Sequence, residues 1–135
     1  MENHIEPISI PQPVRTGEML TASLYDLIKK SRIVQPLDDD LGWSIGDVLS
    51  QLLQEAGEFS EQVMIREGKL PHKEPDHDGV LLEAADAINC IVDAVSKQYP
   101  NDAPSAVLTK LSNAIDKKGD IWVEKVKKFH RDKFQ

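Results

Sequence analysis

Apolar side chains recur at intervals of three and four residues along most of this sequence, and no stretch alternates polar and apolar residues as a half-buried strand would. The clearest rows begin near Leu20, Ile45, Leu81 and Leu108, and each continues for several helical turns. Only 5% of the residues are aromatic, so Leu, Ile, Val and Ala must build the core, which suits packed helices. The sequence therefore predicts an all-α fold, a bundle of four to five helices.

The N-terminal segment differs from the rest of the chain. Pro7, Pro11 and Pro13 disfavour helix and predict an extended arm over residues 1–15, which leaves a single helical domain over residues 16–135. The segment is acidic and lacks the apolar stretch of a signal peptide, and no apolar run approaches the roughly 20 residues of a membrane span. The single cysteine excludes an intrachain disulfide. We expect a cytoplasmic protein without a membrane partner.

Capping and breaking residues predict where the helices begin and end. The expected helices span residues 16 to about 34, 44 to about 68, 76 or 78 to about 99, and 101 towards the C-terminus. Pro36 should end the first helix, so that the acidic run at residues 38–40 becomes a solvated loop. Ser44 and Asp47 have the spacing of an N-terminal capping box. The apolar row of the last helix stays in phase across Gly119, which predicts one long helix with a weak point at that glycine, or a close helix crossing there.

Two pairs of acidic residues carry the strongest chemical signal. Glu55 and Glu58 lie three residues apart in the second predicted helix, and Glu83 and Asp86 have the same spacing in the third. This spacing puts both members of a pair on one helix face, and Glu55 also falls within the apolar row. Four converging carboxylates require compensation, which a hard divalent cation supplies. No histidine occupies an i+3 position, so the oxygen donors favour Mg²⁺ or Mn²⁺ over iron.

These two motifs resemble those of a known enzyme family. Glu-x-x-Glu, a spacer of a couple of dozen residues and Glu-x-x-Asp form the signature of the MazG-like, all-α nucleoside triphosphate pyrophosphohydrolases. The resemblance extends over most of residues 37–134 and includes Trp43 before the second helix. It implies a helical bundle that forms a homodimer or a dimer of dimers around the acidic site. It also implies hydrolysis of a nucleoside triphosphate to a monophosphate and pyrophosphate, a nucleotide-pool house-cleaning activity.

The resemblance assigns roles residue by residue. The expected Mg²⁺ ligands are Glu55, Glu58, Glu83 and Asp86, the expected catalytic residues are Glu58 and Asp86, and the expected substrate contacts are Asn89, Lys117, Lys118 and Trp43. Glu58 is at the edge of the apolar row and is our candidate for the general base. The match to a Lys-x-x-x-Arg ending is incomplete, because Trp122 stands four residues after Lys118.

The charge of the sequence is unevenly distributed. The net charge of −7 combines a balance of −11 over residues 1–103 with +4 over residues 104–135, and the acidic part argues against a nucleic-acid partner.

The sequence leaves two other functional interpretations open. One alternative keeps the fold and acts on phosphoribosyl-ATP in histidine synthesis. The other is a non-enzymatic helical dimer, a regulatory or adaptor module whose acidic residues face solvent.

Overall fold

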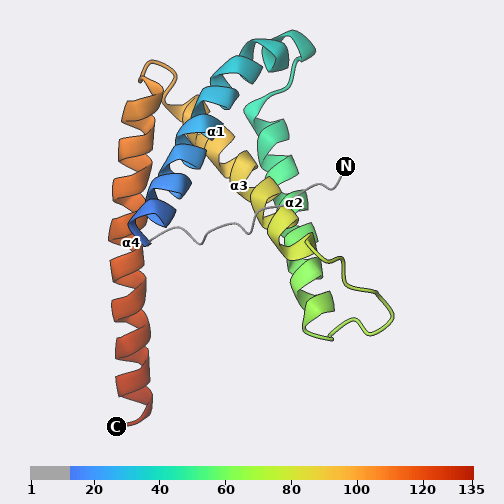
Figure 1. The fold of residues 1–135 in the computed structure, drawn as a ribbon, viewed down its shortest axis with the longest axis vertical. Coiled ribbons are helices and arrows are strands. Elements are labelled where there is room, and N and C mark those ends of the chain that lie inside the picture. The colour runs from blue at the N-terminus through green and yellow to red at the C-terminus, as the bar shows by residue number, and fades with distance from the viewer. Residues whose placement is uncertain (1–12) are drawn as a thin grey trace, which may run out of the picture.

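The computed structural model describes the backbone of residues 13–135 and the side chains from residue 18 onwards. Four helices account for almost all of it: α1 (Pro13–Leu41), α2 (Ile45–Arg66), α3 (Gly79–Gln98) and α4 (Pro104–Lys133) (Figure 1). Residues 13–135 contain no strand, so the predicted all-α class is confirmed. Most of the predicted arm lies outside the described residues, but α1 already begins at Pro13, so Thr16 lies inside a helix rather than at its start.

The helices form an open arrangement rather than a closed bundle. The most extensive packing is between α2 and α3, while α1 packs across α3 and the first part of α4, and α2 contacts neither α1 nor α4. Figure 1 shows the α2–α3 pair and the lower half of α4 diverging from the region where α1, α3 and α4 meet. No described helix has the length and apolarity needed to cross a lipid bilayer.

A small apolar core holds α1, α3 and α4 together. Ile28, Val92 and Val107 are its buried members, one from each helix. The half-buried side chains packed around them are Leu24, Leu27, Val95, Leu108 and Leu111. Several residues of the predicted apolar rows instead remain exposed, among them Leu49, Leu53, Leu81, Leu82 and Ile88. One copy of the chain therefore leaves much of its apolar surface uncovered.

The prediction that Pro36 ends the first helix is wrong. α1 continues through Pro36 to Leu41, and its last turns bend away from the preceding part (Figure 1), as expected where a proline removes one backbone hydrogen bond. The helix ends where Gly42 adopts a φ of 71°, the left-handed conformation that glycine tolerates. The Trp43 amide then donates to the carbonyl of Asp38 at 2.8 Å, which closes the turn into α2.

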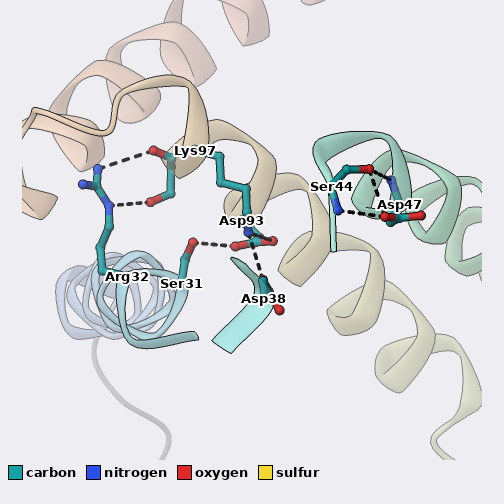
Figure 2. A network of polar contacts seen from close by, with 8 residues as sticks. Ser31, Arg32, Asp38, Ser44, Asp47, Asp93 and Lys97 are labelled. Atoms are coloured by element: carbon teal, nitrogen blue, oxygen red, sulfur yellow. Dashed lines mark hydrogen bonds and ion pairs between the residues drawn. The ribbon is translucent and has the colours of Figure 1, made fainter. Parts of the chain in front are cut away.

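A polar network explains why α1 continues beyond the proline (Figure 2). The Nζ of Lys97 lies 3.2 Å from Oδ2 of Asp38 and 2.7 Å from Oδ2 of Asp93. The Ser31 hydroxyl donates to the other oxygen of Asp93 at 2.5 Å. Asp38 is therefore a half-buried helical residue anchored to α3, and not part of a solvated loop as the sequence suggested. Ion pairs across the proline fix the last turns of α1 to α3.

Arg32 adds a second connection, at the end of α3 (Figure 2). Its guanidinium donates to the Ser96 hydroxyl at 2.8 Å, to the carbonyl of Tyr99 at 2.7 Å and to the carbonyl of Pro100 at 2.8 Å. The last carbonyls of a helix lack partners within the helix, and a cation there also complements the helix dipole. Arg32 thus caps α3 from α1.

The predicted capping box is confirmed at the start of α2. The Asp47 amide donates to Oγ of Ser44, and the Ser44 amide donates to the Asp47 carboxylate at 2.7 Å. These hydrogen bonds hold the pKa of Asp47 below its ordinary value. At the other predicted starts, Asp78 precedes α3 without a side-chain hydrogen bond to its first turn, and Pro104 is the first residue of α4. α4 runs unbroken through Gly119, as predicted.

Ser44→Ala should lower the free energy of unfolding by about 1 kcal/mol, because it removes the acceptor of the capping box. The measurement is the urea midpoint at constant slope. Ser60→Ala is the matched control, since Ser60 is exposed within the same helix and should change stability by less than about 0.5 kcal/mol. Equal midpoints for the two variants would contradict the assigned role of Ser44.

Candidate functional site

Three of the four predicted acidic residues meet between α2 and α3. One carboxylate oxygen from each of Glu55, Glu58 and Glu83 lies within 4.8 Å of the other two, and all three side chains are half-buried. Gly79 contributes to this close approach at the start of α3, because it is buried and a Cβ there would collide with the Gln62 side chain of α2. The i, i+3 pair of α2 thus faces Glu83 across the interface of the two helices.

Two oxygens of this cluster have no hydrogen-bond partner among the residues that the structure describes. Oε2 of Glu55 and Oε2 of Glu83 are buried and accept no hydrogen bond from the described part of the chain. Buried polar atoms in folded proteins are almost always hydrogen-bonded, because an unmatched one costs the free energy of its lost hydration. The cluster is therefore electrostatically incomplete, and the missing partner must be positively charged or donate hydrogen bonds.

The pKa values of Glu55 and Glu83 reflect this environment. Burial raises the pKa of both carboxyls, and the neighbouring Glu58 raises both further through its charge and hydrogen bonding. The charge of Asp86 adds to the same shift at each residue. Without a cation, the ionised forms of Glu55 and Glu83 repel their neighbours and disfavour the folded state.

Glu83→Gln should raise the melting temperature of the metal-free protein at neutral pH, because the folded state disfavours the ionised Glu83. The raised pKa means that this destabilisation is absent below the ordinary value of 4.5 and grows as the pH rises towards the folded-state pKa. The advantage of the variant should therefore vanish towards pH 4. The measurement is thermal unfolding in EDTA from pH 4 to 8, with the exposed loop variant Glu74→Gln as control. A variant less stable than the parent chain at pH 7.5 would refute the repulsion.

Asp86 lies beside the cluster rather than within it, and Asn89 lies about one turn further along α3. Both residues are exposed on α3, three residues apart. Asp86 contributes no oxygen to the group of carboxylate oxygens that lie within 4.8 Å of one another. Asp86 lies one helical turn from Glu83 on α3, and its charge raises the pKa of both Glu55 and Glu83. The structure thus brings three predicted ligands together, with Asp86 beside them. The predicted roles of Asp86 and Asn89 remain predictions.

A surface pocket lies along α2 next to the acidic cluster. It has a volume of about 340 Å³ and is lined by Trp43, Asp47, Ser50, Gln51 and Gln54. The Gln54 amide donates to Oε1 of Glu58 at 3.2 Å, which connects the pocket wall to the cluster. Gln51 and Gln54 were not among the predicted site residues, although each lies four residues before an acidic member and so on its helix face.

The two lysines predicted to contact phosphate lie on a different helix from the acidic cluster. Lys117 and Lys118 are exposed on α4, and α4 does not contact α2. One copy of the chain therefore does not bring them to the acidic cluster. Their predicted contact with a phosphate group stays a prediction.

Comparison with known proteins adds no relative: no protein-family model matches the chain, and no curated protein or solved structure is significantly similar to it. The resemblance to the MazG-like enzymes consequently rests on the two acidic motifs and on their positions in two packed helices.

Proposed function

We propose that this protein is a Mg²⁺-dependent nucleoside triphosphate pyrophosphohydrolase, for which Mn²⁺ can replace Mg²⁺. It would cleave a nucleoside or deoxynucleoside triphosphate between the α- and β-phosphates to give the monophosphate and pyrophosphate. The observation that supports this proposal best is the cluster of Glu55, Glu58 and Glu83, in which two buried oxygens have no hydrogen-bond partner within residues 18–135. The resemblance to the MazG-like enzymes also suggests the biological role of this activity, which is house-cleaning of the nucleotide pool.

The donor set fits a hard divalent cation. Glu55, Glu58 and Glu83 offer only carboxylate oxygens, and they come from two helices that are tightly packed together. When bound, Mg²⁺ would orient the phosphates and stabilise the charge that develops during phosphoryl transfer. It would also reverse the local negative field, which otherwise repels a triphosphate.

The neighbouring residues suggest how the chain would treat its substrate. Glu58 accepts a hydrogen bond from Gln54 at Oε1, which orients its carboxylate, and it would accept a proton from the attacking water. Asp86 is exposed at the open side, where it would assist in placing the phosphates. Trp43 borders the adjoining pocket and is partly exposed, so its ring would stack on a nucleobase there.

Self-association belongs to the same proposal. The α2–α3 pair carries exposed apolar side chains next to the acidic cluster: Leu49, Leu53, Leu81, Leu82 and Ile88. An apolar surface of this extent is unusual for a monomer in water. We expect these faces of two copies to meet in a homodimer, or in a dimer of dimers, around the acidic site.

The test is a panel of canonical and modified NTPs and dNTPs assayed for pyrophosphate release with Mg²⁺ and with EDTA. The products should be a monophosphate and pyrophosphate, and EDTA should abolish their formation. Release of inorganic phosphate alone would contradict cleavage between the α- and β-phosphates. Phosphoribosyl-ATP belongs in the panel, because selective turnover of it would support the related enzyme instead.

A binding measurement separates the enzyme from an adaptor. Mg²⁺ with a non-hydrolysable triphosphate should raise the melting temperature by several degrees, because a ligand bound only by the folded state stabilises that state. The same nucleotide in EDTA is the control. A melting temperature that does not change with the nucleotide, in Mg²⁺ or in EDTA, together with no turnover, would favour a non-enzymatic helical dimer.

A further inference from the structure

The second half of α4 extends beyond the rest of the chain. Leu108 and Leu111 pack on the core near the start of the helix, but every residue from 112 to 135 except Gly119 is exposed. Figure 1 shows this half of the helix, in orange to red, running past the beginning of α1 with no other helix beside it. We call residues 115–133 the α4 extension. Nothing in the described chain covers it.

The α4 extension continues the apolar row that reaches the core. Ile115, Trp122, Val126 and Phe129 follow Leu111 at intervals of four, seven, four and three residues, so they lie on the same side of the helix. Their exposed fractions are 52%, 68%, 53% and 68%. The two aromatic rings alone leave roughly 300 Å² of mostly apolar surface in water. A patch of this size on one helix marks an interaction surface.

The charge of the α4 extension indicates what covers that surface. Residues 115–133 contain seven Lys or Arg and four Asp or Glu, whereas residues 1–103 have a balance of −11. Two extensions would repel each other, and the net charge of −7 disfavours approach to anionic membranes or nucleic acid. The acidic remainder of another copy offers the opposite charge together with exposed apolar side chains.

We propose that the α4 extension docks on the acidic body, residues 18–103, of a second copy of this chain. The docking is reciprocal, so a two-fold dimer closes with one extension on each body. Trp122 and Phe129 are its apolar anchors, and lysines beside the row, such as Lys125 and Lys133, face acidic side chains of the other copy. This inference does not depend on the proposed enzymatic function. The surface that it assigns to self-association, the α4 extension, is different from the exposed α2–α3 faces of the same copy.

The first test compares dimer dissociation constants by sedimentation velocity of the full chain. Trp122→Ala with Phe129→Ala should weaken association by about 100-fold, because both anchors are removed. Ile121→Ala with Val123→Ala is the matched control: these exposed residues flank the row on the same helix and should change the constant less than about threefold. Ile28, Val92 and Val107 form the core and are untouched, and far-ultraviolet circular dichroism verifies the helix content of each variant.

The second test changes charge and leaves the apolar row intact. Lys125→Glu with Lys133→Glu should weaken the dimer at low salt, and the difference from the parent chain should shrink as salt screens the charges. Lys127→Glu with Arg131→Glu is the control, because those residues lie on the opposite side of α4 and carry the same number of charges. Equal weakening by both pairs would contradict docking through the apolar row.

Other occupants of the surface give different results. A parent chain that stays monomeric, or a dimer that resists both α4 variants but dissociates in Leu49→Glu with Leu53→Glu, would overturn the proposal. So would binding of a monomer to anionic phosphatidylserine vesicles through Trp122. A monomer whose Trp122 fluorescence changes on deletion of residues 1–12 would assign the surface to that segment of the same chain instead. Loss of pyrophosphate release, by itself, would leave the inference standing.

Discussion

Glu58→Gln should reduce pyrophosphate release at least about 1000-fold at saturating nucleotide and Mg²⁺. The substitution removes both the candidate general base, a contribution of roughly 10²–10⁴ in rate, and one charged oxygen donor of the cluster. Glutamine has the same shape and can still contact Gln54, so the packing of α2 against α3 is kept. The effect should appear mainly in kcat, because the proton transfer occurs only in the transition state.

Glu61→Gln is the matched control for this experiment. Glu61 lies one turn further along α2 and forms an ion pair with Lys73, outside the acidic cluster. Its replacement should change kcat less than about threefold, since Glu61 is not a member of the cluster that would hold the metal. Unchanged turnover in both Glu58→Gln and Asp86→Asn would eliminate the proposed site, whatever activity the chain retained.

Lys97→Met should lower the free energy of unfolding by about 3 kcal/mol, the largest stability effect that we expect. The three side chains of the ion-pair cluster are only 12% exposed at Lys97, 17% at Asp38 and 24% at Asp93. Methionine keeps the length of the side chain but leaves two facing carboxylates without their cation, and breaking a buried pair typically costs about 3–5 kcal/mol. The measurement is the urea midpoint, and the melting temperature should fall by roughly 10 °C.

Lys110→Met tests whether burial causes that effect. The Lys110–Asp102 pair has a similar distance, 2.6 Å, but its lysine is 55% exposed, so its loss should cost less than about 1 kcal/mol. Adding Asp38→Asn and Asp93→Asn to Lys97→Met should restore part of the lost stability by removing the unpaired charges. Equal effects of the Lys97 and Lys110 variants would show that the network does not anchor α1 to α3.

The local features of this fold follow from neighbouring residues. The capping box of Ser44 and Asp47 begins α2 as predicted, because its hydrogen bonds span only three residues. α4 crosses Gly119 without a break, because one glycine costs a long helix only about 1 kcal/mol. The meeting of Glu55 and Glu58 with Glu83 could also be anticipated, since the i, i+3 spacing fixes the faces and consecutive elements usually lie next to each other in space.

Tertiary contacts decided what local rules could not. Pro36 predicts the end of a helix, but the ion pair between Asp38 and Lys97, 59 residues apart in the chain, holds the turns beyond it in helical form. The same contact makes Asp38 structural rather than solvated. Apolar periodicity likewise identifies which side of a helix avoids water, but not which partner covers it. Trp122 and Leu53 belong to well-formed rows and remain exposed, because burial depends on the position of a second surface in space.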